Sequence, residues 1–467
     1  MRWTAGAAIR CASSARRDCR TRLPGWSARS NWRSASRRPP MRAKPLVLVS
    51  ALAAILAGCG QPGVPQGRIE LTLWKHQAGD TEEAANRAAI ARFNAEQSRW
   101  YITAQSIPQS GYTQSIVAAS LAGQMPCLMT VDQPKVASFV WAGFLQPIDR
   151  LVPKALLDQV TPAGKGTYRG RIYSVGQFDA ALAIFARRSA LHRVDARIPT
   201  LDRPWSLAEF DDILLKLKAT GAYAYPLDLS TRDTKADWWT YAFSPMLESF
   251  GSDLVDRRTM TADGVLNGPV AVRFATWFHW LFAKGLVDRR EPDENAFVDG
   301  RAALAYTGNW WAPDYRRRVG DDLLILPPPD FGHGTVIGGG SWQWAISRSC
   351  DHPQGAAAFI RFMLKPQEVA AMADAAGMIP VTEQGAALSR DFRPGGDGRV
   401  FYELMHRFAR ERPATPAFSM ISTTFFDAMR NIMDGENPQD ALDDAADDVD
   451  RSTADNRGYR PADGVAP

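Results

Sequence analysis

The sequence contains few of the residue patterns that bring catalytic or metal-binding groups together. Its six histidines include no His-Glu-x-x-His pair and its five cysteines no Cys-x-x-Cys, so neither common zinc spacing is present. Gly340-Ser341 lacks the second glycine of a nucleophile elbow, and Gly164-Lys165-Gly166 lacks both the spacing and the Ser/Thr of a phosphate-binding loop. No pair of carboxylates is marked out for glycosidic-bond hydrolysis. These patterns predict a protein that is not an enzyme and uses no cofactor or metal.

A different kind of chemistry is indicated by Leu56-Ala57-Gly58-Cys59, at the end of the apolar run Leu46 to Ile55. Basic residues precede this run, which is typical of an export signal and shorter than the roughly 20 apolar residues of a membrane-spanning helix. The box resembles the lipobox of bacterial lipoproteins, which implies cleavage before Cys59 and acylation of that cysteine. An ordinary secretory leader, in which Cys59 has no role, is the alternative.

The residues upstream of this leader are strongly basic. Residues 1–40 contain ten arginines and one acid, and Met41 directly precedes the basic start of the leader. We therefore expect 1–40 to be a mis-assigned upstream extension and 41–58 to be the signal peptide; a disordered basic arm is the alternative. Residues 59–467 carry 43 basic and 49 acidic side chains, so the mature protein offers no electrostatic footprint for nucleic acid.

Length and cysteine content limit the architecture of the mature chain. About 400 residues exceed what one hydrophobic core usually supports, which predicts two lobes. Cys127 and Cys350 are the only cysteines after Cys59. We expect them to be two buried free thiols, although an oxidising compartment would permit a disulfide between them. No later apolar run reaches spanning length, so the mature chain is expected to be soluble apart from its lipid anchor.

The first part of the mature chain alternates between strand and helix patterns. Hydrophobic alternation predicts strands at 69–74, 101–107 and 127–131, and helical spacing predicts helices from Asp80, at 112–122 and at 134–141. Asp80 and Glu83 are expected to form a capping box. This order implies an α/β fold with a parallel sheet and right-handed crossovers.

Several short segments follow one another in a recognisable order. They are Ala91-Arg-Phe-Asn94, Ala122-Gly-Gln-Met-Pro126, Gly143-Phe-Leu-Gln-Pro-Ile-Asp149, Phe297-Val-Asp-Gly-Arg-Ala-Ala303, Gly308-Asn-Trp310, Gly338-Gly-Gly-Ser-Trp342 and Gly377-Met-Ile-Pro380. Their order resembles that in the carbohydrate-binding proteins of bacterial ABC importers, the maltose-binding-like solute-binding proteins. The likeness covers nearly all of 67–455. Two positions depart from the family pattern, because Cys127 stands where an aspartate is usual and Tyr173-Ser-Val-Gly176 lacks the usual proline.

The resemblance implies a two-lobed periplasmic-binding-protein fold of type II, with discontinuous lobes, a hinge and a ligand cleft between the lobes. Ligand is expected to close the lobes by hinge motion. The expected segments are a tether at 59–67, a first lobe of 68–176 plus 341–385, a second lobe of 177–340 plus 386–455, and a C-terminal tail at 456–467.

A sugar ring has an apolar face and a belt of hydroxyl groups, so its site needs flat aromatic rings and polar side chains. The aromatic candidates are Trp74, Trp238, Trp239, Trp310, Trp311 and Trp342. Adjacent residues on an extended segment point to opposite sides, so only one of Trp310 and Trp311 should face the ligand. One of Trp238 and Trp239 is expected to reach the cleft, and Trp344 is expected in the core.

The polar candidates lie at strand ends and crossings, and a cap or turn role is the alternative for the aspartates. They are His76, Asp132, Gln177 and Asp179. Lys75 is a candidate for contact with a phosphorylated ligand. The loop that contains Arg232, Asp233 and Asp237 is expected to be solvated.

From these features we expect an extracytoplasmic solute-binding protein, held at the membrane by a lipid. Its expected role is to capture a mono- or oligosaccharide and deliver it to the permease of an ABC transporter, working as a monomer. One alternative is the same fold with a glycerophosphate or polyamine ligand. An extracytoplasmic glycosidase and a sensor that partners a membrane kinase are two further alternatives.

Overall fold

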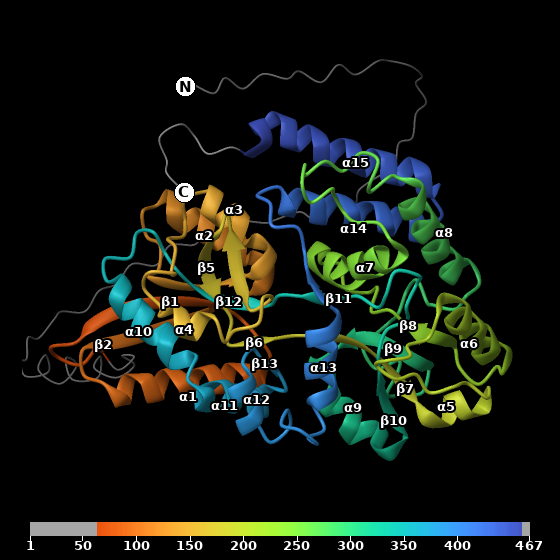
Figure 1. Cartoon of the computed structure of the whole chain (residues 1–467), viewed down its shortest axis with the longest axis horizontal. Coiled ribbons are helices and arrows are strands. Elements are labelled where there is room, and N and C mark those ends of the chain that lie inside the picture. Colours follow the sequence, from red (N-terminus) through yellow and green to blue (C-terminus); the bar gives the residue numbers. More distant parts are fainter. Residues whose placement is uncertain (1–62, 460–467) are drawn as a thin grey trace, which may run out of the picture. The chain divides into compact units, whose positions relative to one another are not determined.

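Two separate β-sheets organise the part of the chain that the computed structural model describes, residues 63–459 (Figure 1). The first sheet has six strands in the order β2-β1-β3-β12-β5-β4. Its strands are β1 (Ile69–His76), β2 (Trp100–Ile107), β3 (Leu128–Asp132), β4 (Lys165–Tyr168), β5 (Arg171–Val175) and β12 (Trp342–Ile346). We call this sheet and the helices packed on it the first lobe.

The alternating pattern of β1 explains how the first sheet is buried. Leu71 and Leu73 point into the core, whereas Glu70 and Thr72 are exposed. β1 pairs in parallel with both β2 and β3, as the sequence predicts, while β12 joins β3 antiparallel and makes the sheet mixed. The expected helices are present beside these strands.

Helices cover both faces of the first sheet. The apolar side chains of α1 (Asp80–Glu96) and α10 (Pro353–Met363) pack in one core cluster, and those of α2 (Tyr112–Leu121) and α3 (Val136–Trp141) pack in another. α11 (Pro366–Ala376) lies against α1, and α12 (Glu383–Leu388) against α11. The short helix α4 (Lys154–Leu157) precedes β4.

The second sheet has four strands in the order β10-β7-β9-β8. We call this sheet and its helices the second lobe. Its strands are β7 (Leu182–Arg187), β8 (Tyr225–Asp228), β9 (Ala302–Gly308) and β10 (Leu323–Leu326); its helices are α5 (Arg188–Arg193), α6 (Leu207–Ala219), α7 (Ala236–Phe250), α8 (Pro269–Ala283) and α9 (Ala312–Val319). All seven residues of β9 are buried, so this strand forms the centre of the lobe.

Two short strand pairs lie outside the two main sheets. β6 (Phe178–Asp179) pairs with β13 (Ile379–Pro380), and β11 (Ile337–Gly339) pairs with β14 (Ala409–Glu411). β6 separates β5 of the first sheet from β7 of the second, and β11 precedes β12. These segments carry the chain from one lobe to the other.

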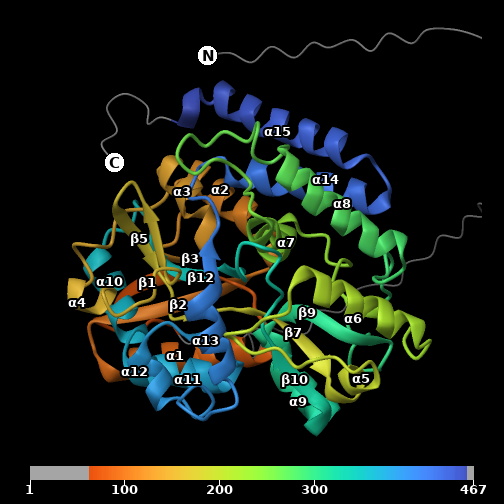
Figure 2. The same cartoon turned by 45° about the vertical axis from the view of Figure 1, so that its right-hand side comes forward.

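The C-terminal helices pack mainly on the second lobe. α13 (Arg399–Phe408) contacts β7 and β11, and α14 (Phe418–Asp434) packs against α7, α8 and α15 (Pro438–Asp455). Figure 2 shows α14 and α15 running together beside α8. α15 buries Ala441, Leu442, Ala445 and Val449, and most of its acidic residues are exposed.

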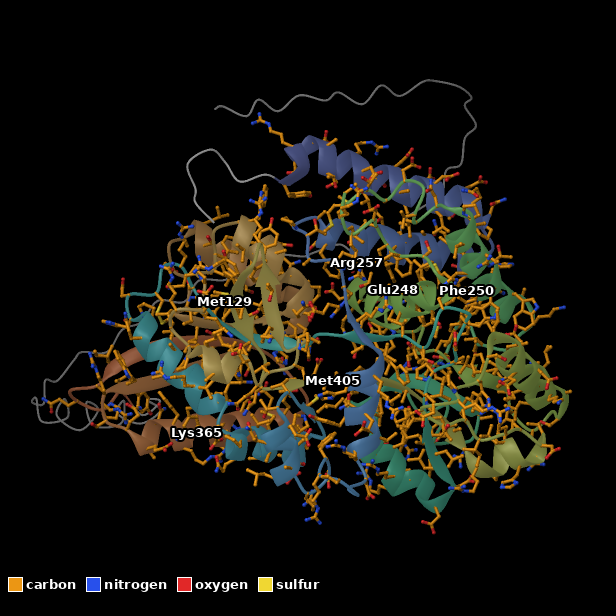
Figure 3. All side chains as sticks on the ribbon, in the orientation of Figure 1. Met129, Glu248, Phe250, Arg257, Lys365 and Met405 are labelled. Carbon is orange, nitrogen blue, oxygen red and sulfur yellow. A yellow bond between two sulfur atoms is a disulfide. The ribbon has the colours of Figure 1, made fainter. Side chains whose placement is uncertain are left out.

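Arg257 connects α7 to the crossing strand β14. The guanidinium of Arg257 lies 3.0 Å from the Glu248 carboxylate and donates to the carbonyl of Glu411 (Figure 3). Burial raises the pKa of Glu248 to about 7, because desolvation disfavours its charged form.

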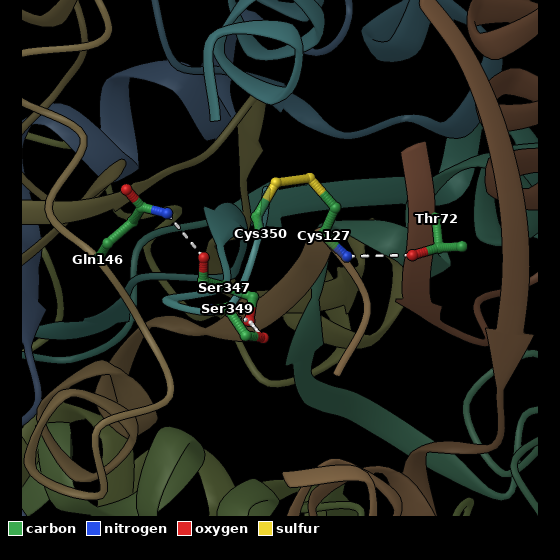
Figure 4. The surroundings of a disulfide bond; sticks show 6 residues. All are labelled: Thr72, Cys127, Gln146, Ser347, Ser349 and Cys350. Atoms are coloured by element: carbon green, nitrogen blue, oxygen red, sulfur yellow. Dashed lines mark hydrogen bonds between the residues drawn. A yellow bond between two sulfur atoms is a disulfide. The ribbon is translucent and has the colours of Figure 1, made fainter. Parts of the chain in front are cut away.

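Two expectations about this part of the chain are wrong. Asp80 and Glu83 form no capping box, because Gly79 is the N-cap of α1 and Glu83 instead accepts from Lys75 and from the amide of Ala78. The expectation of free thiols also fails, because Cys127 and Cys350 form a disulfide with a Cα–Cα distance of 4.4 Å (Figure 4). This bond joins the residues next to β3 and β12, whose pairing brings the two cysteines together.

Candidate functional site

A cavity of about 710 Å³ lies between the two lobes. From the first lobe it is lined by the end of β1, the starts of α1 and α2 and the residues after β3. From the second lobe it is lined by the loop before α7, the start of α7 and the residues after β9. Carboxyl ends of parallel strands are where open α/β sheets usually hold ligands.

The first-lobe wall is a stack of rings around Trp342. The His76 ring lies 4.1 Å from the Trp342 ring at an interplanar angle of 10°, and Tyr112 meets Trp342 edge-on at 5.4 Å. The His76 ring has polar neighbours at both nitrogens, since Nδ1 lies 3.3 Å from Thr130 Oγ1 and Nε2 lies 3.2 Å from Glu82 Oε1. The orientation of His76 against Trp342 is thus supported by contacts within the first lobe.

The second-lobe wall is also aromatic. Trp238 and Trp310 meet at 76° with 6.1 Å between ring centroids, and Tyr241 lies 6.4 Å from Trp310. Trp311 stacks on Tyr315 at 5.9 Å. Each of the two lobes thus presents aromatic rings to the cavity.

Charged side chains of the cavity occur as acid–base pairs. Lys135 Nζ lies 2.6 Å from Asp237 Oδ2, and Lys235 Nζ lies 3.2 Å from Asp233 Oδ2. The remaining lining acids are Glu82, beside His76, and Asp132, whose Oδ1 lies 3.8 Å from Arg412 Nη2. Among the described residues, each lysine or arginine that lines the cavity therefore has a carboxylate oxygen no more than 3.8 Å away.

Arg412 anchors the floor of the cavity, where the crossing segments meet. Its guanidinium is only 4% exposed, donates to the carbonyl of Gly340 at 3.2 Å and lies over the Tyr241 ring. Gly340 has φ +87°, and a side chain there would collide with Gln133, so only glycine fits this approach. Burial raises the pKa of Asp132, while the positive charge of Arg412 opposes that rise.

Six of the ten predicted ligand-contact residues line this cavity: His76, Asp132, Trp238, Trp310, Trp311 and Trp342. Trp310 and Trp311 both face it, against the expectation that only one would. They lie on a 3₁₀ turn, Asn309–Trp311, and not on an extended segment, so their side chains are not forced to opposite sides. Cys59 lies outside the described residues.

The other four predicted contacts lie outside the cavity. Trp239 is fully buried in the core, where its indole donates to the carbonyl of Asp233. Gln177 donates to the carbonyl of Glu368, and Trp74 packs in the first lobe with its carbonyl bonded by Tyr112. Asp179 is fully buried at the crossing and accepts from the amide of Ala180.

Lys75 is also unavailable to a ligand. It is 2% exposed and its Nζ lies 2.6 Å from the carboxylate of Glu83. Trp344 is 4% exposed and meets Phe359 in the first-lobe core, as expected of it.

Several residues that line the cavity were not among the ligand contacts expected from the sequence. They include Glu82, Tyr112, Lys135, Asp233, Lys235, Asp237, Tyr241 and Arg412. The loop of Asp233 and Asp237 is not simply solvated, because it forms one wall of the cavity. The start of α7 held one usable signal, since Asp237, Trp238 and Tyr241 repeat at helical spacing.

Residues 63–459 contain no cluster of three or more His, Cys, Asp or Glu side chains arranged to hold a metal ion. In the same part of the chain, no helix combines the length and the apolar character needed to cross a membrane.

Comparison with known proteins gives consistent matches. The family model of bacterial extracellular solute-binding proteins matches residues 88–392. An uncharacterized lipoprotein of Streptomyces antibioticus is 24% identical, covering 74% of this chain and 77% of its own. The sn-glycerol-3-phosphate-binding periplasmic protein of Shigella dysenteriae is 21% identical, covering 84% and 94%. The crystal structure of the cyclic alpha-maltosyl-1,6-maltose binding protein from Arthrobacter globiformis superposes with a TM-score of 0.70 at 22% identity, covering 82% of this chain and 99% of that one.

Proposed function

The chain belongs to the bacterial extracellular solute-binding proteins, and from this premise we propose that it captures a carbohydrate in the cavity between its lobes and delivers it to an ABC transporter permease. The observation that carries the proposal is the combination of aromatic walls on both lobes with acid–base pairs around them. Rings cover the apolar face of a sugar, and carboxylates, guanidinium and ammonium groups bond its hydroxyls. The cavity volume of about 710 Å³ lies within the range of small-molecule sites.

The charge arrangement favours a neutral ligand over a phosphorylated one. A phosphate group needs convergent cations that are free to bind it, and Arg is the usual choice. Here Lys135, Lys235 and Arg412 already lie beside carboxylates. The relative that binds sn-glycerol-3-phosphate keeps that ligand as the second candidate, and it would have to displace Asp132 from Arg412.

A polyamine is the third ligand class and would use the same cavity differently. It would bind carboxylates beside aromatic rings, which Asp233 and Asp237 next to Trp238 provide. These two carboxylates are occupied by Lys235 and Lys135, so a polyamine would have to replace both ammonium groups.

We further propose that the mature protein works outside the cytoplasm, attached to the membrane by acylation of Cys59. The disulfide between Cys127 and Cys350 supports this location, because such bonds persist in oxidising compartments. The similar protein of Streptomyces antibioticus carries the word lipoprotein in its name. Incorporation of radiolabelled palmitate into the wild-type protein, and its loss in Cys59→Ser, tests the anchor.

Thermal unfolding with a ligand panel tests the binding function. The panel contains mono- and oligosaccharides, glycerophosphates and polyamines, added one at a time to the protein. A ligand at 100 times its dissociation constant stabilises the fold by about 2.7 kcal/mol, which appears as a rise of a few degrees in Tm. A rise with sugars alone is the expected result, and a rise only with phosphates or polyamines would replace the carbohydrate by that class.

A second assay addresses catalysis, because we propose that the protein binds sugar without hydrolysing it. The sugar that raises Tm is incubated with the protein and recovered by chromatography. Recovery of the intact sugar is expected, and release of smaller sugars would favour the glycosidase alternative.

A further inference from the structure

A buried charged cluster lies behind the loop that forms the second-lobe wall of the cavity. It consists of Asp228 at the end of β8, Arg232 in the following loop and Glu291 after α8. Arg232 Nη1 lies 3.0 Å from Glu291 Oε2 and 3.6 Å from Asp228 Oδ1. None of the three lines the cavity, so a ligand there does not touch them.

The cluster contains two carboxyl groups and one base. The side chains of Asp228 and Glu291 are 1% and 0% exposed, so each is shielded from water. Burial and the nearby charge of Asp228 raise the pKa of Glu291 to about 9. Arg232 is the basic side chain that contacts both acids, and Glu291 is the nearer of the two.

Hydrogen bonds connect this cluster to the cavity wall. Asp228 Oδ1 accepts from the amide of Ser230 at 2.7 Å. The carbonyl of Ser230 then accepts from Trp238 Nε1 at 3.1 Å and from the amide of Asp233 at 3.2 Å. Trp238 and Asp233 both line the cavity. A continuous chain of contacts thus runs from the buried charges to a ring that faces the ligand.

The backbone of Ser230 connects Asp228 to Trp238 through these hydrogen bonds. Its φ is +54°, in the left-handed region that a residue other than glycine rarely adopts. Such a conformation persists only where its surroundings hold it, and here the bond to Asp228 does so. The turn directs the Ser230 carbonyl toward the indole of Trp238.

We propose that Asp228, Arg232 and Glu291 are positioning residues that fix the turn at Ser230 and thereby set the orientation of Trp238 in the ligand cavity. This inference rests on the proposed function for its consequence, because Trp238 matters to a carbohydrate only if one binds there. The positioning itself is independent of the ligand.

Fluorine NMR of the full chain labelled with 5-fluorotryptophan tests the positioning without any ligand. The resonance of Trp238 is assigned from its absence in Trp238→Phe. Asp228→Ala removes the acceptor of the Ser230 amide, and we expect the Trp238 resonance to shift or broaden. Asp228→Asn keeps a side-chain oxygen that can accept from the Ser230 amide, so we expect it to resemble the wild type.

Asp211 provides a matched control in the same lobe. Asp211 Oδ1 accepts from Trp277 Nε1 at 2.9 Å, and neither residue lines the cavity. Asp211→Ala should disturb the Trp277 resonance and leave that of Trp238 in place. If Asp228→Ala fails to fold, Arg232→Met replaces it, because this variant removes the contacts of the loop with Glu291 and Asp228. An unmoved Trp238 resonance in a folded Asp228→Ala or Arg232→Met protein overturns the inference.

A binding measurement adds the functional consequence. With the sugar that stabilises the wild type, we expect Asp228→Ala or Arg232→Met to weaken affinity about three- to tenfold, because the Trp238 ring is displaced but still present. Wild-type affinity in a variant with a displaced Trp238 resonance would refute the link to binding. If no sugar stabilises the wild type, the proposed function fails while the fluorine spectrum still decides the positioning.

Discussion

Lys135 and Asp237 form an ion pair across the cavity, with 2.6 Å between Nζ and Oδ2. Lys135 comes just before α3 of the first lobe, and Asp237 lies in the first turn of α7 of the second. Both line the cavity, so the contact that joins the lobes is also placed to meet a ligand.

We expect Asp237→Asn to weaken sugar binding more than it weakens the fold. The pair is partly exposed, so its loss should change the free energy of unfolding by about 1 kcal/mol or less. A lost charged hydrogen bond to ligand should cost about 1.5–3 kcal/mol of binding, measurable by calorimetry. Asp158→Asn, in the exposed pair of Lys154 and Asp158 outside the cavity, is the control. Equal affinities in the two variants would contradict this prediction.

Trp238 and Trp310 should supply much of the binding energy. Replacing either by alanine removes a ring from the second-lobe wall, and we expect affinity to fall by about 2 kcal/mol, roughly 30-fold. Trp141→Ala is the matched control, because Trp141 is 43% exposed and lies outside the cavity. Titration of each variant with the stabilising sugar checks the prediction. Unchanged affinity in both Trp238→Ala and Trp310→Ala would remove this wall from the site.

The fold could be predicted well because its signals are local. Alternation in β1 and helical spacing in α2 each report one buried face, and these faces agree with the core clusters of the first lobe. The antiparallel entry of β12 beside β3 could not be predicted in this way. It depends on residues more than 200 positions apart in the chain, and for the same reason the expectation of two free thiols was wrong.

The site could be predicted only in part, because a cavity is defined by which side chains meet and not by their type. Trp342 could be predicted because it lies next to three glycines, Gly338 to Gly340, at an expected hinge. Arg412 follows the short strand β14, and no periodic pattern in the sequence marks it as a cavity residue. It reaches the floor of the cavity where it donates to the carbonyl of Gly340. Asp179 has the residue type of a ligand contact, yet its backbone pairing with Ile379 turns it into the crossing segment.

The buried position of Asp179 predicts a specific pH dependence of stability. Burial raises its pKa to about 7 from the ordinary 3.8. The folded state therefore binds this proton more tightly than the unfolded state, so the free energy of unfolding should fall as pH rises from about 4 to about 7. Over this pH range, we expect the free energy of unfolding, measured in urea, to fall by about 2–4 kcal/mol more in the wild type than in Asp179→Asn, because the asparagine side chain does not titrate. Identical slopes in the two proteins would show that Asp179 ionises normally.

The disulfide should contribute to the stability of the first lobe. It closes a loop of 223 residues in the unfolded chain and joins the start of β3 to the end of β12. Cys127→Ser with Cys350→Ser should lower the free energy of unfolding by about 2–4 kcal/mol, measured by chemical denaturation. Dithiothreitol should lower wild-type stability by a similar amount and leave the double variant unchanged. Neither cysteine lines the cavity, so sugar affinity below the melting temperature should persist in the double variant. A wild type that is insensitive to reduction in a denaturant series would mean that the bond adds nothing to the pairing of β3 with β12.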